Sequence, residues 1–130
     1  MRPHQLEMQA FGPYAEAVTI PFDTLSRDGL FLIHGSTGAG KTYLLDALCF
    51  ALYGDVSGER SVKGLRSDHA PPQAIPQVVL EFSAAGARWR VERQAACEVA
   101  KSRGEGTTSK PARASLWRCQ GEEQQPVASG

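Results

Sequence analysis

The chain has 130 residues, of which 42% are hydrophobic and 22% charged, and its formal net charge at pH 7 is zero. These values are ordinary for a globular domain, and a neutral chain has no overall field that would draw it to nucleic acid or to an acidic membrane. The sequence has no run of about 18 apolar residues and no apolar run of signal-peptide length at its start, so we expect a cytoplasmic protein without a membrane partner. The three cysteines include no CxxC pair and support neither a zinc site nor a disulfide framework.

The first third of the sequence predicts a β hairpin followed by a buried strand. Residues 4–11 alternate between apolar and polar side chains, a Gly-Pro-Tyr turn interrupts them, and residues 16–22 resume with β-branched residues. This is the pattern of an antiparallel pair. Residues 23–29 are predicted to form a loop. The run LFLI at 30–33 is continuously apolar, which is typical of a strand that is buried on both faces.

A glycine-rich segment after this run matches the phosphate-binding pattern Gly-x4-Gly-Lys-[Ser/Thr]. Its glycines allow the backbone to wrap with successive N–H groups pointing inward, and the helix that follows adds unpaired N–H groups and the positive end of its dipole. We expect Lys41 to bridge the β- and γ-phosphates of a nucleotide and the Thr42 hydroxyl to bind Mg²⁺. The residues predicted to bind the nucleotide are Gly35, Ser36, Thr37, Gly38, Ala39, Gly40, Lys41 and Thr42.

The helix predicted behind this loop, TYLLDALCFALY at 42–53, is apolar on every side except at Asp46. Such a helix is expected to be buried all round, beneath a sheet and with more protein against its other flank. Gly54 stands where a left-handed C-cap is expected. We interpret Asp46 as a structural carboxylate near the helix N-terminus, with a direct ligand role as the alternative.

The rest of the sequence predicts a long polar connection, one clear hairpin and a weakly structured end. Residues 55–77 are rich in polar residues, glycine and proline, and residues 77–95 alternate around a glycine-containing turn. Residues 98–112 are low in hydrophobicity and are expected to form a flexible loop. The segment 114–119 is predicted to be a last short strand, and the segment 121–130 an unstructured end.

Charge is unevenly distributed along the chain. Residues 88–118 carry eight basic and three acidic side chains, a net charge of +5, whereas residues 1–60 have a net charge of −3. The basic stretch has two open interpretations. It is either a solvated strand face and loop, or a surface that contacts the phosphates of nucleic acid.

Three stretches carry a resemblance to a known family: AFGPY at 10–14, TGAGKT at 37–42 followed by LLDAL, and LRSDHA at 65–70. Over residues 1–95 the sequence resembles the N-terminal part of the SbcC family, the ATPase subunits of bacterial SbcCD nucleases, which are related to the structural-maintenance-of-chromosomes ATPases. The resemblance implies an α/β fold, namely the N-terminal half of an ABC/SMC-type P-loop NTPase head with an antiparallel β lobe. Residues 96–130 are expected to form a basic loop, a short strand and a flexible tail in an incomplete domain.

The same resemblance implies cofactors and partners. ATP and Mg²⁺ would be the cofactors, and Lys63 and Arg66 would lie near the nucleotide, with solvated loop charge as the alternative for both. The partners would be the C-terminal half of the same head, a nuclease subunit of the SbcD kind, a second head in a head-to-head dimer, and DNA through the assembled complex. The implied function is the ATP-binding portion of a DNA double-strand exonuclease/endonuclease complex that acts in DNA repair and recombination.

The sequence departs from the family pattern in three ways. Tyr43 stands where relatives commonly have Ser or Thr, whose hydroxyl can reach the α-phosphate. No apolar strand ending in Asp-Glu is present to supply a Walker B motif and a water-activating glutamate. The Q-loop glutamine, signature motif, coiled coil and zinc hook are also absent from these residues. We therefore expect a chain that binds nucleotide, has no identifiable catalytic residue, and does not hydrolyse ATP unaided.

Two further functions stay open at this stage. One is a small P-loop nucleotide kinase or a GTPase-like protein, and the other is a non-catalytic truncated remnant. Against the kinase or GTPase, the sequence has no Asn-Lys-x-Asp motif for reading a guanine base. Its phosphate-binding loop also begins only at Gly35, after a complete predicted hairpin.

Overall fold

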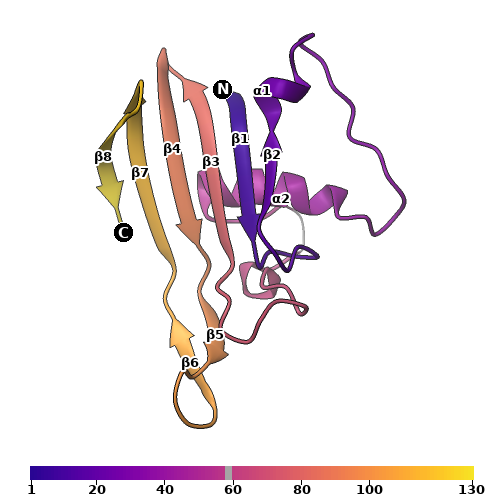
Figure 1. Cartoon of the computed structure of the whole chain (residues 1–130), viewed down its shortest axis with the longest axis vertical. Coiled ribbons are helices and arrows are strands. Elements are labelled where there is room, and N and C mark those ends of the chain that lie inside the picture. The colour runs from indigo at the N-terminus through magenta and orange to yellow at the C-terminus, as the bar shows by residue number, and fades with distance from the viewer. Residues whose placement is uncertain (58–59) are drawn as a thin grey trace.

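The computed structural model describes residues 1–57 and 60–130, and its centre is a six-stranded antiparallel sheet crossed on one face by a helix (Figure 1). In chain order the strands of this sheet are β1 Arg2–Gln9, β2 Val18–Pro21, β3 Gln77–Ala84, β4 Ala87–Gln94, β7 Arg113–Gln120 and β8 Glu123–Ser129. Their order across the sheet is β2-β1-β3-β4-β7-β8, and β5 Cys97–Ala100 pairs with β6 Thr107–Lys110 in a separate two-stranded sheet. The helical elements are α1 Phe22–Leu25, α2 Lys41–Tyr53 and the 3-10 turn η1 Val62–Gly64.

Alternation along the strands gives the sheet one apolar face, and α2 packs on that face against β3 and β4. The register places Leu6 opposite Leu80 and Met8 opposite Val78, so that buried side chains meet across the β1–β3 pair. Because side chains alternate along a strand, the residues between them point to the opposite face. The core that results contains Leu6, Met8, Phe11, Phe22, Ala47, Phe50, Ala51, Leu65, Val78, Leu80, Val91 and Ala95.

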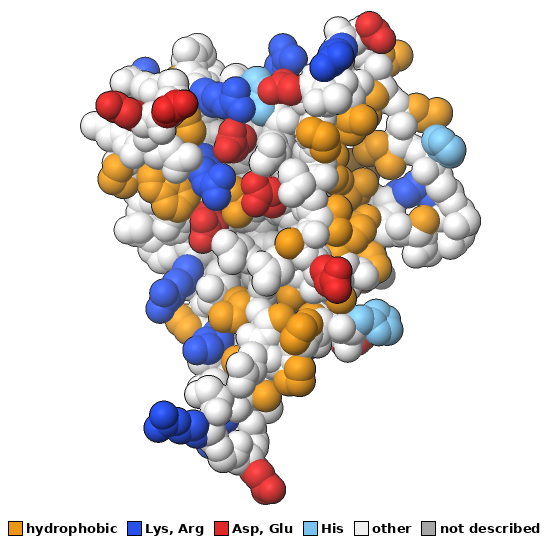
Figure 2. All heavy atoms as spheres, viewed as in Figure 1, with side chains coloured by type: hydrophobic (Ala, Val, Ile, Leu, Met, Phe, Trp, Pro, Cys, Tyr) orange, Lys and Arg blue, Asp and Glu red, His pale blue; other side chains and the backbone are white. Residues whose placement is uncertain are grey.

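The face of the sheet turned away from α2 is polar and carries interleaved charges. Figure 2 shows acidic and basic side chains side by side over the central strands. Arg88 and Arg90 both pair with Glu81 on β3, at N–O distances of 2.9 and 3.5 Å. Part of the basic stretch at 88–118 is therefore neutralised within the sheet, as expected for a solvated strand face.

The predicted hairpins and the predicted helix are confirmed. β1 and β2 pair antiparallel, and so do β3 and β4, which are joined through Ala85 and Gly86 with φ of 50° and 74°. Positive φ at both central residues is the geometry of a tight turn that matches the twist of the strands. Helix α2 ends at Gly54, whose φ of 75° makes it the left-handed C-cap.

The prediction of a buried strand at 30–33 is wrong. The segment has no regular secondary structure, and the side chains of Leu30 and Leu32 are 87% and 82% exposed. A strand needs a neighbour for its backbone N–H and C=O groups, and the strand order of the described residues places none beside this segment. Phe31 packs against α1, with its ring centroid 5.7 Å from that of Phe22. Figure 2 shows hydrophobic side chains exposed on the side where the connection between α1 and α2 runs.

The prediction that α2 lies beneath a sheet is confirmed, whereas its burial on every side is not found among the described residues. One face, with Ala47, Phe50 and Ala51, is buried against the sheet, whereas Leu45 and Tyr53 on the outer side are 56% and 79% exposed. The apolar outer face therefore has only partial cover from the part of the chain that the structure describes.

The predictions of a flexible loop at 98–112 and of an unstructured end at 121–130 are wrong as well. The first segment contributes β5 and β6, and the second forms β8 at the edge of the main sheet. Low hydrophobicity hid β6 and β8 because their residues are almost all exposed, so that pairing rather than burial defines these two strands.

Two predicted connections contain more structure than expected. Residues 23–29, predicted as a loop, begin within the short helix α1. The connection at 55–77, outside residues 58–59, includes η1 and a β-bridge between Arg66 and Phe11, and it buries Leu65 and Ser67. In the described residues no helix combines the length and the apolar character that crossing a bilayer requires.

Candidate functional site

The glycine-rich loop lies between the extended segment after α1 and the first turn of α2. Gly38 and Gly40 have φ of 84° and 93°, values that a side chain disfavours. The Ala39 N–H donates to the Ser36 carbonyl at 3.1 Å, which closes a turn around these residues. The loop thus has the wrapped backbone that the motif predicts.

Lys41, the first residue of α2, points back into this loop. Its ammonium donates to the carbonyl oxygens of Gly35 and Ser36, the latter at 2.9 Å. The helix N-terminus beside it receives no side-chain cap from Gly40. Its first N–H groups have no helical acceptor, so this end of α2 combines a lysine with free backbone donors and a positive dipole end.

A hollow of about 320 Å³ opens over these groups. Thr37, Gly38, Gly40, Lys41 and Thr42 line it, so the predicted binding residues are gathered around one space. Gly35 and Ser36 contribute by holding the Lys41 ammonium through their carbonyl oxygens. The other lining residues are Pro13, Tyr43 and Arg60.

The turn at 10–14 supports the end of the loop. The Tyr14 hydroxyl donates to the Gly40 carbonyl at 3.3 Å, and burial raises the pKa of this phenol above its ordinary value of 10. A Cβ placed on Gly40 would lie 2.7 Å from the Tyr14 hydroxyl oxygen and 3.0 Å from Cγ of Pro13. Gly40 is therefore required both for its left-handed φ and for this close approach.

The same turn also receives the side chain of Tyr43. Gly12 has a φ of 55°, and a Cβ built on it would lie 2.6 Å from Cε1 of Tyr43. The Tyr43 ring packs edge-on against Phe11, with a centroid distance of 6.4 Å. The Gly-Pro-Tyr turn is thus shaped to seat the residue that follows Thr42.

Arg60 is a residue of the hollow that sequence reasoning missed. Its guanidinium carbon lies 5.2 Å from the centroid of the Tyr43 ring, and its Nε lies 3.1 Å from Oδ2 of Asp46. The Nε–Oδ2 contact is an ion pair without regular hydrogen-bond geometry. An aromatic residue at 43, followed by a connection at 55–77 that contains two arginines, is the signal that could have pointed to such a pairing.

Asp46 is held as a structural residue. It is fully buried, and the Ser57 hydroxyl donates to its Oδ1 at 2.9 Å. Its carboxylate lies beneath Arg60 and does not line the hollow.

Lys63 and Arg66 are not brought to the hollow. Lys63 is exposed on η1, where its backbone N–H donates to the Ser61 hydroxyl. The Arg66 guanidinium donates to the carbonyl oxygens of Ala74, Ser67 and Pro71, at distances of 2.8 to 3.3 Å, and so holds the shape of its own loop. Their contact with nucleotide stays a prediction.

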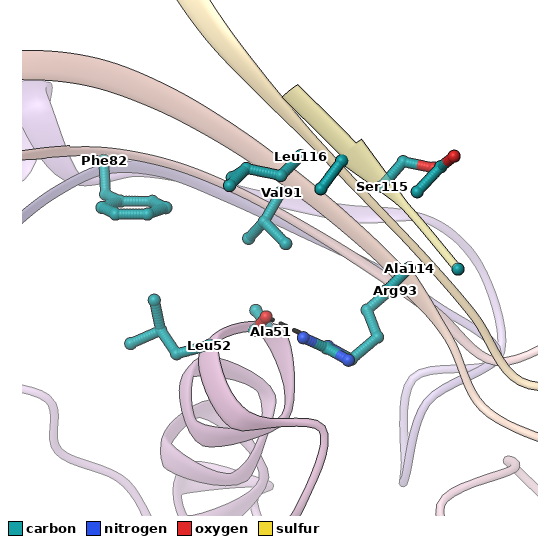
Figure 3. Close-up of a pocket in the computed structure, with 11 residues that line it drawn as sticks. Ala51, Leu52, Phe82, Val91, Arg93, Ala114, Ser115 and Leu116 are labelled. Atoms are coloured by element: carbon teal, nitrogen blue, oxygen red, sulfur yellow. Dashed lines mark hydrogen bonds between the residues drawn. The ribbon is translucent and has the colours of Figure 1, made fainter. Parts of the chain in front are cut away.

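A second hollow of about 340 Å³ lies at the other end of α2 (Figure 3). It is lined mainly by apolar side chains from α2, β3, β4 and β7, including Leu52, Phe82, Val91 and Leu116. Arg93 crosses its edge, where its Nε donates to the Ala51 carbonyl at 3.2 Å. It lies about 15 Å along the helix from Lys41, so it is separate from the phosphate loop.

A wrapped glycine loop, a lysine and a hydroxyl residue at the start of a helix packed on a sheet define a P-loop NTPase. A sequence profile of the family described as "AAA domain" matches residues 5–123, and the chain belongs to this family.

Particular relatives carry the name of the SbcC component of the nuclease SbcCD, which confirms the resemblance found in the sequence. The one from Vibrio cholerae is 49% identical over 117 residues, which is 89% of this chain and 12% of the relative. The one from Lactococcus lactis is 37% identical over 116 residues, or 89% of this chain and 11% of the relative. The chain thus spans about a tenth of the length of the relatives it matches.

Proposed function

We propose that this chain binds ATP with Mg²⁺ through Gly35–Thr42, as part of the head of an SbcC-like ATPase. The observation that carries the proposal is Lys41 at the start of α2, with its ammonium inside the glycine loop. The donor set fits the cofactors, because an ammonium and free helix N–H groups suit a polyphosphate. The exposed Thr42 hydroxyl offers the oxygen ligand that Mg²⁺ prefers.

The ABC/SMC type of head is part of this proposal. What supports it is the apolar surface of the chain, because the exposed 30–33 segment and the outer face of α2 would both be covered by further strands and helices of a larger head. We propose that the C-terminal half of the same head supplies this cover. The bare segment LFLI would then become the buried strand that its sequence indicates.

The name of the relatives supports the remaining partners. It makes each of them one component of the two-part nuclease SbcCD. We extend this to the present chain and propose an SbcD-like partner, a head-to-head dimer, contact with DNA through the assembled complex, and a role in DNA repair and recombination. We propose the cytoplasm as the compartment of this DNA repair and recombination role.

The hollow supports nucleotide binding more than hydrolysis. Phosphoryl transfer to water needs a group that positions the water. Among the described residues that line the hollow, none is a carboxylate or a histidine. We therefore propose that the chain alone binds ATP without turning it over.

The test is titration calorimetry of the 130-residue chain with ATP and Mg²⁺. Lys41→Ala is expected to weaken binding at least tenfold, because it removes the one ammonium held in the loop. Lys101→Ala, which removes an exposed charge at the β5–β6 end, is the control for net charge and should bind as the native chain does. Equal affinity of the native chain and Lys41→Ala would contradict the proposed function, and ATP turnover that Lys41→Ala abolishes would contradict the proposal of binding alone.

A further inference from the structure

The hollow over the phosphate loop contains a second cation, and nothing in the nucleotide-binding motif accounts for it. Besides Lys41, the described residues that line the hollow include one other basic side chain, Arg60. It belongs to the connection between α2 and β3, and it comes to the loop only through the tertiary structure.

Two contacts fix the position of the Arg60 guanidinium. Its guanidinium carbon lies 5.2 Å from the centroid of the Tyr43 ring. Its Nε pairs at 3.1 Å with Oδ2 of Asp46, which is fully buried. Because the guanidinium stacks on an aromatic ring and pairs through Nε, none of the contacts found among the described residues uses its two terminal NH₂ groups. The side chain is 41% exposed, so these groups are accessible from solvent.

The order of the residues along the hollow indicates which phosphate Arg60 would meet. In a phosphate loop of this kind the lysine reaches the β- and γ-phosphates and the following hydroxyl binds Mg²⁺. Lys41 points back toward Gly35 and Ser36, whereas Arg60 stacks on the ring of Tyr43, the residue that follows Thr42 in α2, and lines the same hollow. A polyphosphate that starts at Lys41 and leaves past residue 43 would bring its α-phosphate to Arg60.

We propose that Arg60, seated on Tyr43 and anchored by Asp46, is the α-phosphate contact of the bound nucleotide, in place of a hydroxyl at position 43. This inference rests on the proposed binding of ATP at Gly35–Thr42. Arg60 is a binding residue in this scheme, and Tyr43 is a positioning residue that acts through it.

The test compares ADP with ATP by titration calorimetry of the full chain in the presence of Mg²⁺. An α-phosphate is present in both ligands, so Arg60→Ala is expected to weaken both by the same factor, roughly 10- to 100-fold. Arg103→Ala removes an equal charge from the exposed β5–β6 connection and should change neither affinity. A loss confined to ATP would assign Arg60 to the γ-phosphate and overturn the inference, as would equal affinities of Arg60→Ala and the native chain.

Two further variants separate binding from fold stability. Tyr43→Leu removes the aromatic seat but keeps an apolar side chain, and it should weaken both nucleotides about two- to fivefold. In Tyr43→Thr the new hydroxyl should make Arg60→Ala nearly neutral, within about twofold. If Arg60→Ala costs the same affinity in the Tyr43→Thr background, Arg60 acts only on the structure and the inference fails.

The same set of measurements distinguishes the two proposals. If Lys41→Ala binds both nucleotides as the native chain does, the proposed nucleotide site itself is wrong. If Lys41→Ala weakens binding and Arg60→Ala does not, the site stands and the assignment of Arg60 is wrong.

Discussion

The Tyr14 hydroxyl lies 3.3 Å from the Gly40 carbonyl and so joins the turn after β1 to the last residue of the phosphate loop. The two residues are 26 positions apart in the sequence. The link means that the end of the loop is held by the sheet as well as by α2. It also gives the AFGPY segment a physical role, which is to set the position of Gly40.

Tyr14→Phe should weaken both the fold and nucleotide binding. The change removes one partly buried hydrogen bond and keeps the ring, so a loss of about 1 kcal/mol in the free energy of unfolding is expected. Because Gly40 precedes Lys41 directly, ATP affinity should also fall about threefold. Urea unfolding and titration calorimetry measure the two effects, and an unchanged affinity would show that the loop holds its shape without Tyr14.

Gly12→Ala should destabilise the chain by a clash with Tyr43. The new Cβ would lie 2.6 Å from Cε1 of Tyr43, and φ at this residue is 55°. Together these features should cost about 2 to 4 kcal/mol in the free energy of unfolding. Gly29→Ala is the matched control, because its φ is 81° and no described atom lies within 4 Å of its Cβ, so it should cost only about 1 kcal/mol.

A double variant tests whether the clash with Tyr43 causes the effect of Gly12→Ala. Tyr43→Ala in the Gly12→Ala background removes the ring and should recover most of the difference between Gly12→Ala and Gly29→Ala. If thermal melting shows no recovery, backbone strain alone explains the effect of Gly12→Ala.

Arg93→Met should loosen the C-terminal end of α2. The Arg93 Nε donates to the Ala51 carbonyl at 3.2 Å and places a positive charge where the helix dipole is negative. Loss of this contact is expected to lower the free energy of unfolding by about 1 to 2 kcal/mol. Arg88→Met, which breaks the surface pair with Glu81, should change it by about 0.5 kcal/mol or less. Equal effects of the two changes in urea unfolding would contradict the assigned role of Arg93.

Stability should fall at acid pH in part through Asp23. The hydrogen bond with His4 is the largest cause that lowers the pKa of Asp23 below its ordinary value of 3.8; burial, the next largest, opposes it, and the charges of His4, Arg2 and Arg88 lower the pKa further. A lowered pKa in the folded state means that the folded protein binds fewer protons than the unfolded chain. The contribution of ionised Asp23 to the free energy of unfolding is therefore fully present above about pH 4. It is lost as the pH falls through the pKa of Asp23 in the folded protein.

Asp23→Asn should remove this part of the acid dependence. The urea midpoint of the variant should fall less between pH 5 and pH 3 than that of the native chain. Glu122→Gln, which removes an exposed carboxylate from the β7–β8 turn, controls for the change in net charge. Parallel curves for the native chain and Asp23→Asn would show that the His4 contact does not act through ionisation.

Leu32→Ser should improve solubility without a loss of stability. The Leu32 side chain is 82% exposed, so its replacement leaves the core unchanged and the free energy of unfolding within about 0.5 kcal/mol. It also interrupts an exposed apolar run that favours association. Light scattering against concentration measures the first effect, and co-expression with the C-terminal half of a head should give the native chain a similar gain. Equal yield and equal thermal melting with and without that half would argue against the proposed cover.

Elements with local sequence features were predictable, whereas elements that depend on a neighbouring strand were not. The two hairpins and α2 were predicted correctly because alternation, the Ala85–Gly86 turn and Gly54 are local features. The segment 30–33 and the strand β8 were predicted wrongly in opposite directions. An apolar run forms a strand only beside a partner, and a polar run does so when β7 lies next to it.

The shape of the phosphate loop follows from local sequence, because Gly38 and Gly40 permit the left-handed backbone and Lys41 begins the helix that follows. The surroundings of that loop depend on the tertiary structure. It brought Arg60 onto Tyr43, turned Arg66 to carbonyl oxygens of its own loop, and placed Tyr14 against Gly40. Backbone conformation is set by each residue and its neighbours, whereas these contacts join residues that the chain must fold to bring together.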